Sequence, residues 1–129
     1  MLMLDTNAII HYGNRNIKRL GKMLYQRLNT EDELIIHPVS YFEIAYKNRH
    51  RRLALSAPVD LWIKRFRGMP GVRDVRTDWK DFYQAAALDY PVGDPADRML
   101  VASAMNRNLS IVTSDRVMIN FDGVKTIDY

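Results

Sequence analysis

Short apolar runs alternate with longer amphipathic segments along the whole chain, and this alternation constrains the fold most strongly. The chain opens with four apolar residues that stop at an acid, which is typical of a buried strand at its carboxyl end. Further strands are predicted at residues 34–37, 72–75, 109–113 and 124–127. Helices are predicted at residues 16–28, 41–46, 58–66 and 78–89, and from residue 94 onward. We therefore expect an α/β fold with a mainly parallel sheet of four or five strands and helices on both faces.

The length and composition indicate one domain over residues 1–129. With 47% hydrophobic residues the chain can form an apolar core of its own, and it contains no Cys. Disulfides, a thiolate nucleophile and Cys-bound metals are thereby excluded. The three His residues, at positions 11, 37 and 50, have no zinc-like spacing, so packing or surface roles are favoured for them.

The charge pattern indicates a polyanionic partner. Residues 1–76 carry 14 Lys and Arg against 7 Asp and Glu, whereas residues 77–129 carry 5 against 8. Nucleic acid is the leading candidate, and a solvated basic surface is the alternative. In the basic run of residues 47–52, Arg49, Arg51 and Arg52 are candidate RNA contacts. No signal peptide or membrane span is recognisable, so we expect a cytoplasmic protein with no membrane contact.

Acidic residues gather at one predicted edge of the sheet. Asp5 ends the first strand, and Asp115 follows the strand at 109–113. Glu43 lies in the first turn of one helix and Asp97 in the first turn of another, with Asp94 one turn earlier. Ligands of open α/β sheets bind at the carboxyl ends of the strands, where these residues should meet.

Each acid except Asp5 also has a simple structural explanation. Glu43 fits the second half of a capping box that begins at Ser40. Asp94 and Asp97 could serve a helix N-terminus, which is the favoured role for Asp94, and Asp115 could hold a turn. Asp5 follows four apolar residues and has no basic neighbour in the sequence.

Converging carboxylates repel one another and raise each other's pKa values unless a cation neutralises them. Carboxylate oxygens with retained water are the ligands that Mg²⁺ and Mn²⁺ prefer. Such a cluster without a dedicated nucleophile indicates metal-assisted attack by water, with a phosphodiester as the natural substrate. The residues alone therefore indicate a metal-dependent nuclease or phosphohydrolase.

Four segments of the sequence resemble PIN domains, and especially the VapC ribonuclease toxins of VapBC toxin–antitoxin pairs. They are residues 2–10, 39–45, 94–102 and 111–115, in the order of that family. The resemblance implies an α/β/α sandwich, cleavage of RNA, a VapB-like antitoxin and a homodimer. Many relatives carry His and Arg before the third segment, where this chain has residues 90–94 as YPVGD.

The resemblance also assigns residues to roles. It implies an acidic site around Mg²⁺ or Mn²⁺ made of Asp5, Glu43, Asp97 and Asp115, with Asp5 and Asp97 as direct ligands. Supporting hydrogen bonds around these carboxylates would come from Thr6, Asp94, Thr113 and Ser114. Arg98 is either a phosphate contact or a member of a surface ion pair.

Two other functions remain open from the sequence. An Asp-dependent phosphatase would use Asp5 as its nucleophile, but such enzymes place a second Asp where this chain has Asn7. A catalytically idle binding module for RNA or protein could also use this fold. Two helical faces look too apolar for a small domain to bury, which favours a partner contact there. They comprise Ile17, Leu20 and Leu24 and Val59, Trp62 and Phe66.

Overall fold

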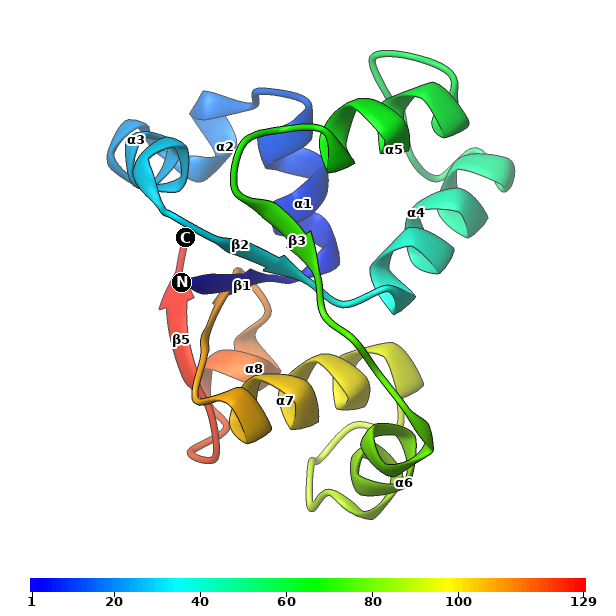
Figure 1. Cartoon of the computed structure of the whole chain (residues 1–129), viewed down its shortest axis with the longest axis vertical. Coiled ribbons are helices and arrows are strands. Elements are labelled where there is room, and N and C mark those ends of the chain that lie inside the picture. Colours follow the sequence, from blue (N-terminus) through cyan, green and yellow to red (C-terminus); the bar gives the residue numbers. More distant parts are fainter.

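Five parallel strands form one sheet at the centre of the molecule (Figure 1). The structure is a computed structural model that describes residues 1–129. The strands are β1 (Leu2–Leu4), β2 (Leu34–Ile36), β3 (Val72–Asp74), β4 (Ser110–Thr113) and β5 (Lys125–Asp128). Their order is β3-β2-β1-β4-β5, and every neighbouring pair is parallel. The predicted α/β class and mainly parallel sheet are confirmed.

Helices cover both faces of the sheet, as the alternating pattern predicts. They are α1 (Thr6–Gly13), α2 (Ile17–Leu20), α3 (Lys22–Thr30), α4 (Val39–Arg49), α5 (Val59–Arg67), α6 (Trp79–Ala87), α7 (Pro95–Arg107) and α8 (Arg116–Ile119). Figure 1 shows α1 to α5 on one side of the sheet and α6 to α8 on the other. None of these helices combines the length and hydropathy that crossing a bilayer requires.

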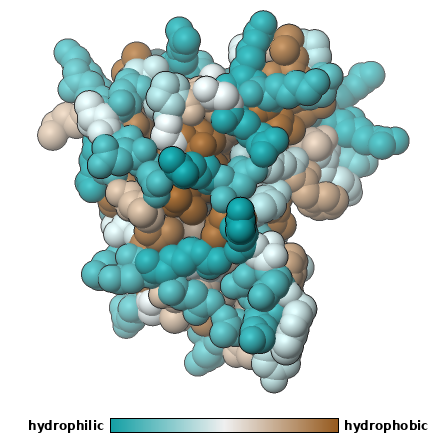
Figure 2. Space-filling model, in the orientation of Figure 1, coloured by the Kyte–Doolittle hydropathy of each residue, from teal (hydrophilic) through white to brown (hydrophobic).

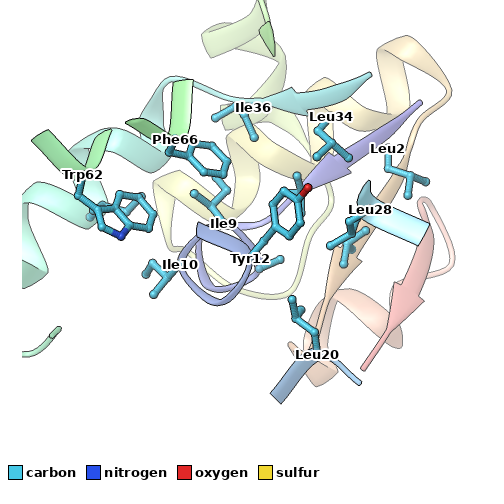
Figure 3. Packing of buried hydrophobic residues seen from close by; sticks show 14 residues of the cluster. Leu2, Ile9, Ile10, Tyr12, Leu20, Leu28, Leu34, Ile36, Trp62 and Phe66 are labelled. Carbon is cyan, nitrogen blue, oxygen red and sulfur yellow. The ribbon is translucent and has the colours of Figure 1, made fainter. Parts of the chain in front are cut away.

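The core is divided by the sheet, because alternate residues of each strand point to opposite faces. Leu2 and Leu4 of β1 belong to the cluster beneath α1, α3 and α5, whereas Met3 belongs to the cluster beneath α7 and α8. Figure 3 shows the first cluster, with Phe66 of α5 close to Ile9 of α1. Helices on both faces leave the carboxyl ends of β1 and β4 open at one edge.

The two apolar helical faces that suggested a partner contact are mostly part of this core. Leu20, Trp62 and Phe66 are buried in the first cluster, and Leu24 and Val59 pack against it. Ile17 alone of the six is exposed. Most of these two faces is therefore buried within the chain itself, and a partner contact there stays a prediction for the part that remains accessible. On the face in Figure 2, hydrophobic surface lies between hydrophilic side chains in separate areas.

Two local differences from the sequence-based expectation have physical causes. The helix expected over residues 16–28 is split into α2 and α3, because Gly21 adopts a φ of 85° that ends the first helix. Helix α1 was not expected. Its residues are apolar on nearly all sides, so they show no helical period, although Asp5 accepts a capping hydrogen bond from the backbone of Ala8.

Candidate active site

A polar cavity lies at the carboxyl edge of the sheet, and we call it the acid pocket. Its volume is about 260 Å³, and no hydrophobic residue lines it. The lining residues are Asp5, Thr6, Asn7, Glu43, Lys47, Asp94, Asp97 and Asp115. The structure thus brings together all four acids that the sequence singled out, from segments that are far apart in the chain.

Asp5 lies at the end of β1 and is only 5% exposed. Its Oδ1 accepts a hydrogen bond of 2.7 Å from the backbone of Ala8, and its Oδ2 accepts one of 2.5 Å from Thr113. Thr113 also accepts a bond of 3.0 Å from the backbone N–H of Asp115. The hydroxyl of Thr113 therefore connects two acids of the acid pocket, in the supporting role expected of it.

Glu43 is oriented by Thr6. The Thr6 hydroxyl donates to Glu43 Oε1 at 2.5 Å, and it lies 3.0 Å from the hydroxyl of Ser40. The capping box expected between Ser40 and Glu43 is absent, because α4 begins at Val39 and Ser40 lies inside the helix. The carboxylate of Glu43 consequently faces the acid pocket rather than its own helix end.

Asp94 and Asp115 each cap a helix while also lining the acid pocket. Asp94 Oδ1 accepts hydrogen bonds from the backbones of Ala96 and Asp97, at 2.9 and 3.2 Å. Asp115 Oδ1 accepts one of 2.8 Å from the backbone of Val117. These bonds fix both carboxylates, and for Asp94 they match the capping role that the sequence favours.

Two acids of the acid pocket, Asp5 and Asp97, have raised pKa values. Burial raises the pKa of Asp97 to about 7, assisted by the negative charges of Asp94, Asp115, Glu43 and Asp5. Burial likewise raises the pKa of Asp5 to about 6, against the opposing effect of its hydrogen bonds. Asp5 and Asp97 are therefore easier to protonate than an isolated Asp, because burial and the neighbouring negative charges both disfavour their ionised forms.

Arg98 has a role that the sequence did not predict. Its five N–H groups donate to five backbone carbonyls at the end of α6 and in the loop before α7. The acceptors are the carbonyl oxygens of Ala85, Ala86, Leu88, Tyr90 and Val92. The guanidinium is fully engaged in organising this loop, so neither the phosphate contact nor the surface ion pair fits the geometry.

The remaining expected residues lie around the acid pocket. Ser114 is partly buried next to Asp115 but does not line the cavity. Arg49, Arg51 and Arg52 are exposed at the end of α4 and just beyond it. None of the three His residues lines the acid pocket.

Sequence reasoning missed two lining residues, Asn7 and Lys47. A signal for Lys47 was present, because it lies four residues after Glu43 and so shares a face of the same helix. Asn7 follows Thr6 in the first turn of α1, a helix that was itself not expected. Lys47 is the one basic side chain in the lining, where its charge offsets part of the acidic excess.

The donor set fits a hard divalent cation. All the acidic donors are oxygens, and five carboxylates share the cavity with a single Lys. No group of three acids or His residues is close enough to form a fully protein-bound metal cluster. Mg²⁺ does not need one, because it commonly binds through one or two carboxylates and retains several waters.

The fold and this acidic edge define a class of protein. The family model of the PIN domain matches residues 2–124, and the chain belongs to that family. The resemblance seen in the four sequence segments is thereby confirmed.

Individual relatives point to the same group. The chain is similar to Ribonuclease VapC22 of Mycobacterium tuberculosis (strain ATCC 25618 / H37Rv), with 31% identity over 117 residues, which cover 89% of this chain and 87% of the relative. Among solved structures, a chain of DNA-bound VapBC from Salmonella typhimurium is 25% identical, with a TM-score of 0.65, and the match covers 99% of this chain and 98% of that one. A chain of VapBC2 from Rickettsia felis, bound to a promoter DNA fragment, has the same fold with a TM-score of 0.69 and 14% identity, over 98% and 97% of the two chains.

Proposed function

We propose that this protein is a metal-dependent endoribonuclease and the toxin of a VapBC-type toxin–antitoxin pair. The observation that carries the proposal is the acid pocket, in which Asp5, Glu43, Asp97 and Asp115 converge without a neutralising partner for each. The similarity to a protein named Ribonuclease VapC22 supports RNA as the substrate.

The proposed metal-binding roles are those that the family resemblance implies for these positions. Asp5 and Asp97 would hold Mg²⁺ or Mn²⁺ directly, and Glu43 and Asp115 would act directly or through water. Such a cation, when bound, lowers the pKa of water and offsets charge on the phosphodiester. Thr6 and Thr113 orient Glu43 and Asp5 through the hydrogen bonds described above.

Asp97 would also take part in proton handling. Its raised pKa, about 7 without a cation, makes it a group that releases a proton when positive charge enters the acid pocket. Lys47 is placed to contact the phosphate that is cut, because it lines the same cavity as the acids. Asn7 offers an amide beside them as a further polar contact.

The proposed partners are RNA, a VapB-like antitoxin and a second copy of the chain. The solved complexes with similar folds are described as VapBC assemblies, which supports the antitoxin. In this proposal residues 1–129 act as one PIN-like domain, and the protein works in the cytoplasm, where it meets RNA. A short reading frame beside the gene, encoding a DNA-binding segment and an amphipathic tail, is the expected source of the antitoxin.

The test separates cutting from binding. Purified protein is incubated with mixed cellular RNA and Mg²⁺ or Mn²⁺, and RNA affinity is titrated in parallel. We expect the Asp97→Asn variant to lose cleavage and to keep equal or slightly higher affinity, because a negative charge leaves the phosphate path. A wild-type protein that binds RNA but cuts none with either metal would instead be the idle binding module.

A further inference from the structure

A second cavity adjoins the acid pocket, and we call it the aromatic pocket. Its volume is about 340 Å³, and it shares Glu43, Lys47 and Asp94 with the acid pocket. The full lining is Val39, Phe42, Glu43, Tyr46, Lys47, Arg52, Asp94, Pro95 and Ala96. A linear polymer that has a phosphate group in the acid pocket would place its neighbouring unit in the aromatic pocket.

One wall of the aromatic pocket is built from rings on α4. Phe42 and Tyr46 lie one helical turn apart, with ring centroids 5.8 Å apart and ring planes at 24°. Phe42 is 67% exposed and Tyr46 48% exposed. His50 packs against Tyr46 at 4.3 Å and extends the row. Exposed aromatic side chains of this kind can serve as platforms on which nucleic-acid bases stack.

Charge distinguishes this surface from an ordinary apolar groove. Two cationic residues, Lys47 and Arg52, line the aromatic pocket together with the rings, beside the two carboxylates, Glu43 and Asp94, that it shares with the acid pocket. Aromatic faces flanked by positive charge match the two parts of a nucleotide, a flat base and an anionic phosphate. On the opposite side, Pro95 and Ala96 in the first turn of α7 provide small apolar surface.

Building on the proposed function, we propose that the aromatic pocket is a subsite for one base of single-stranded RNA next to the phosphodiester that is cut. The base stacks on Tyr46 and Phe42, and Lys47 and Arg52 contact the adjacent phosphates. Duplex RNA keeps its bases stacked inside the helix and cannot insert one. The site therefore selects unpaired RNA.

The test uses binding without metal, so that no RNA is cut. The probes are a short single-stranded RNA with one 2-aminopurine, the same strand in a duplex, and an abasic strand of equal length. The variants are Tyr46→Ala, Tyr46→Phe and, as the matched control, Tyr83→Ala. Tyr83 is 70% exposed on α6 and lines neither pocket.

We expect Tyr46→Ala to weaken single-strand binding about tenfold and to reduce 2-aminopurine quenching. Tyr46→Phe and Tyr83→Ala should behave as wild type, and all proteins should bind the abasic strand equally. An unchanged affinity of Tyr46→Ala, or an equal loss for the abasic strand, would overturn the subsite. So would a change in sedimentation mass of Tyr46→Ala, which would assign the rings to a contact between two copies.

Cleavage by the wild-type protein separates this inference from the proposed function. Base-dependent binding through Tyr46 in a protein that cuts no RNA would support the subsite and contradict the nuclease. RNA cleavage that Tyr46→Ala leaves unaffected, together with unchanged binding, would support the nuclease and contradict the subsite.

Discussion

At the scale of single residues, the acid pocket opposes the stability of the fold. Burial raises the pKa of Asp97, and the surrounding carboxylates raise it further. An acid whose pKa is raised in the folded state binds protons more tightly there than in the unfolded chain. The contribution of Asp97 to stability is therefore greatest at low pH, where its carboxyl is protonated, and it is lost as the pH rises through the raised pKa.

The first prediction concerns this pH dependence. In chelator, Asp97 should add a downward slope to the free energy of unfolding as the pH rises from about 4 to about 7, its pKa values in the unfolded and folded states. Asp97→Asn should reduce this slope and should be more stable than wild type at pH 8 by about 1–3 kcal/mol. Thermal melts from pH 4 to 8 measure both effects. Asp89→Asn, an exposed acid outside the acid pocket, is the control, and an equal slope in wild type and Asp97→Asn would refute the prediction.

At the scale of elements, the sequence predicted those parts whose signals are local. Strand β1 and Asp5 were predictable because an apolar run that stops at an acid needs only neighbouring residues to be interpreted. Helix α1 was not, because burial on nearly all sides removes the helical period. The role of Arg98 was not predictable either, since its acceptors depend on the path of the loop in space.

The second prediction concerns the loop that Arg98 organises between α6 and α7. Arg98→Met should lower the free energy of unfolding by about 2–3 kcal/mol, because five carbonyls lose a charged donor. Urea unfolding measures the loss, and hydrogen exchange should increase first in residues 86–92. The exposed Arg116→Met is the control and should change stability by less than about 0.5 kcal/mol. If the two variants were equally stable and only Arg98→Met had reduced RNA affinity, Arg98 would instead be a phosphate contact.

At the scale of the whole molecule, basic and acidic residues both lie near the carboxyl edge of the sheet. Lys47 of α4 lines the acid pocket, Arg52 lines the adjoining aromatic pocket, and Arg49 and Arg51 are exposed in the same stretch of chain. Part of the positive charge that composition indicated thus lies close to the acids, where it can hold a polyanion against their repulsion. The convergence of four distant segments was predictable because the carboxyl edge of a parallel sheet is a topological property. The pairing of Lys47 with the acids depended on the face of α4 that points inward.

The third prediction concerns salt. Replacing Arg49, Arg51 and Arg52 together by Gln should weaken RNA binding and reduce the slope of log affinity against log salt by about 2. Binding titrations at several salt concentrations measure the slope. The control replaces Lys18, Arg19 and Lys22, which are exposed around α2, on the other side of α1 from α4 in Figure 1. An equal change in both triple variants would mean that net charge, not this surface, binds the RNA.

The fourth prediction tests the central claim, that the acids of four separate segments form one cation site. Calorimetric titration of Mn²⁺ at pH 7.5 is the direct measurement, on wild type, Asp5→Asn and the control Asp89→Asn. Asn at position 5 can still accept the capping hydrogen bond from Ala8, so the fold is retained. We expect saturable Mn²⁺ binding by wild type and Asp89→Asn, and binding at least about tenfold weaker by Asp5→Asn. Mn²⁺ binding of equal strength by wild type and Asp5→Asn would contradict the site.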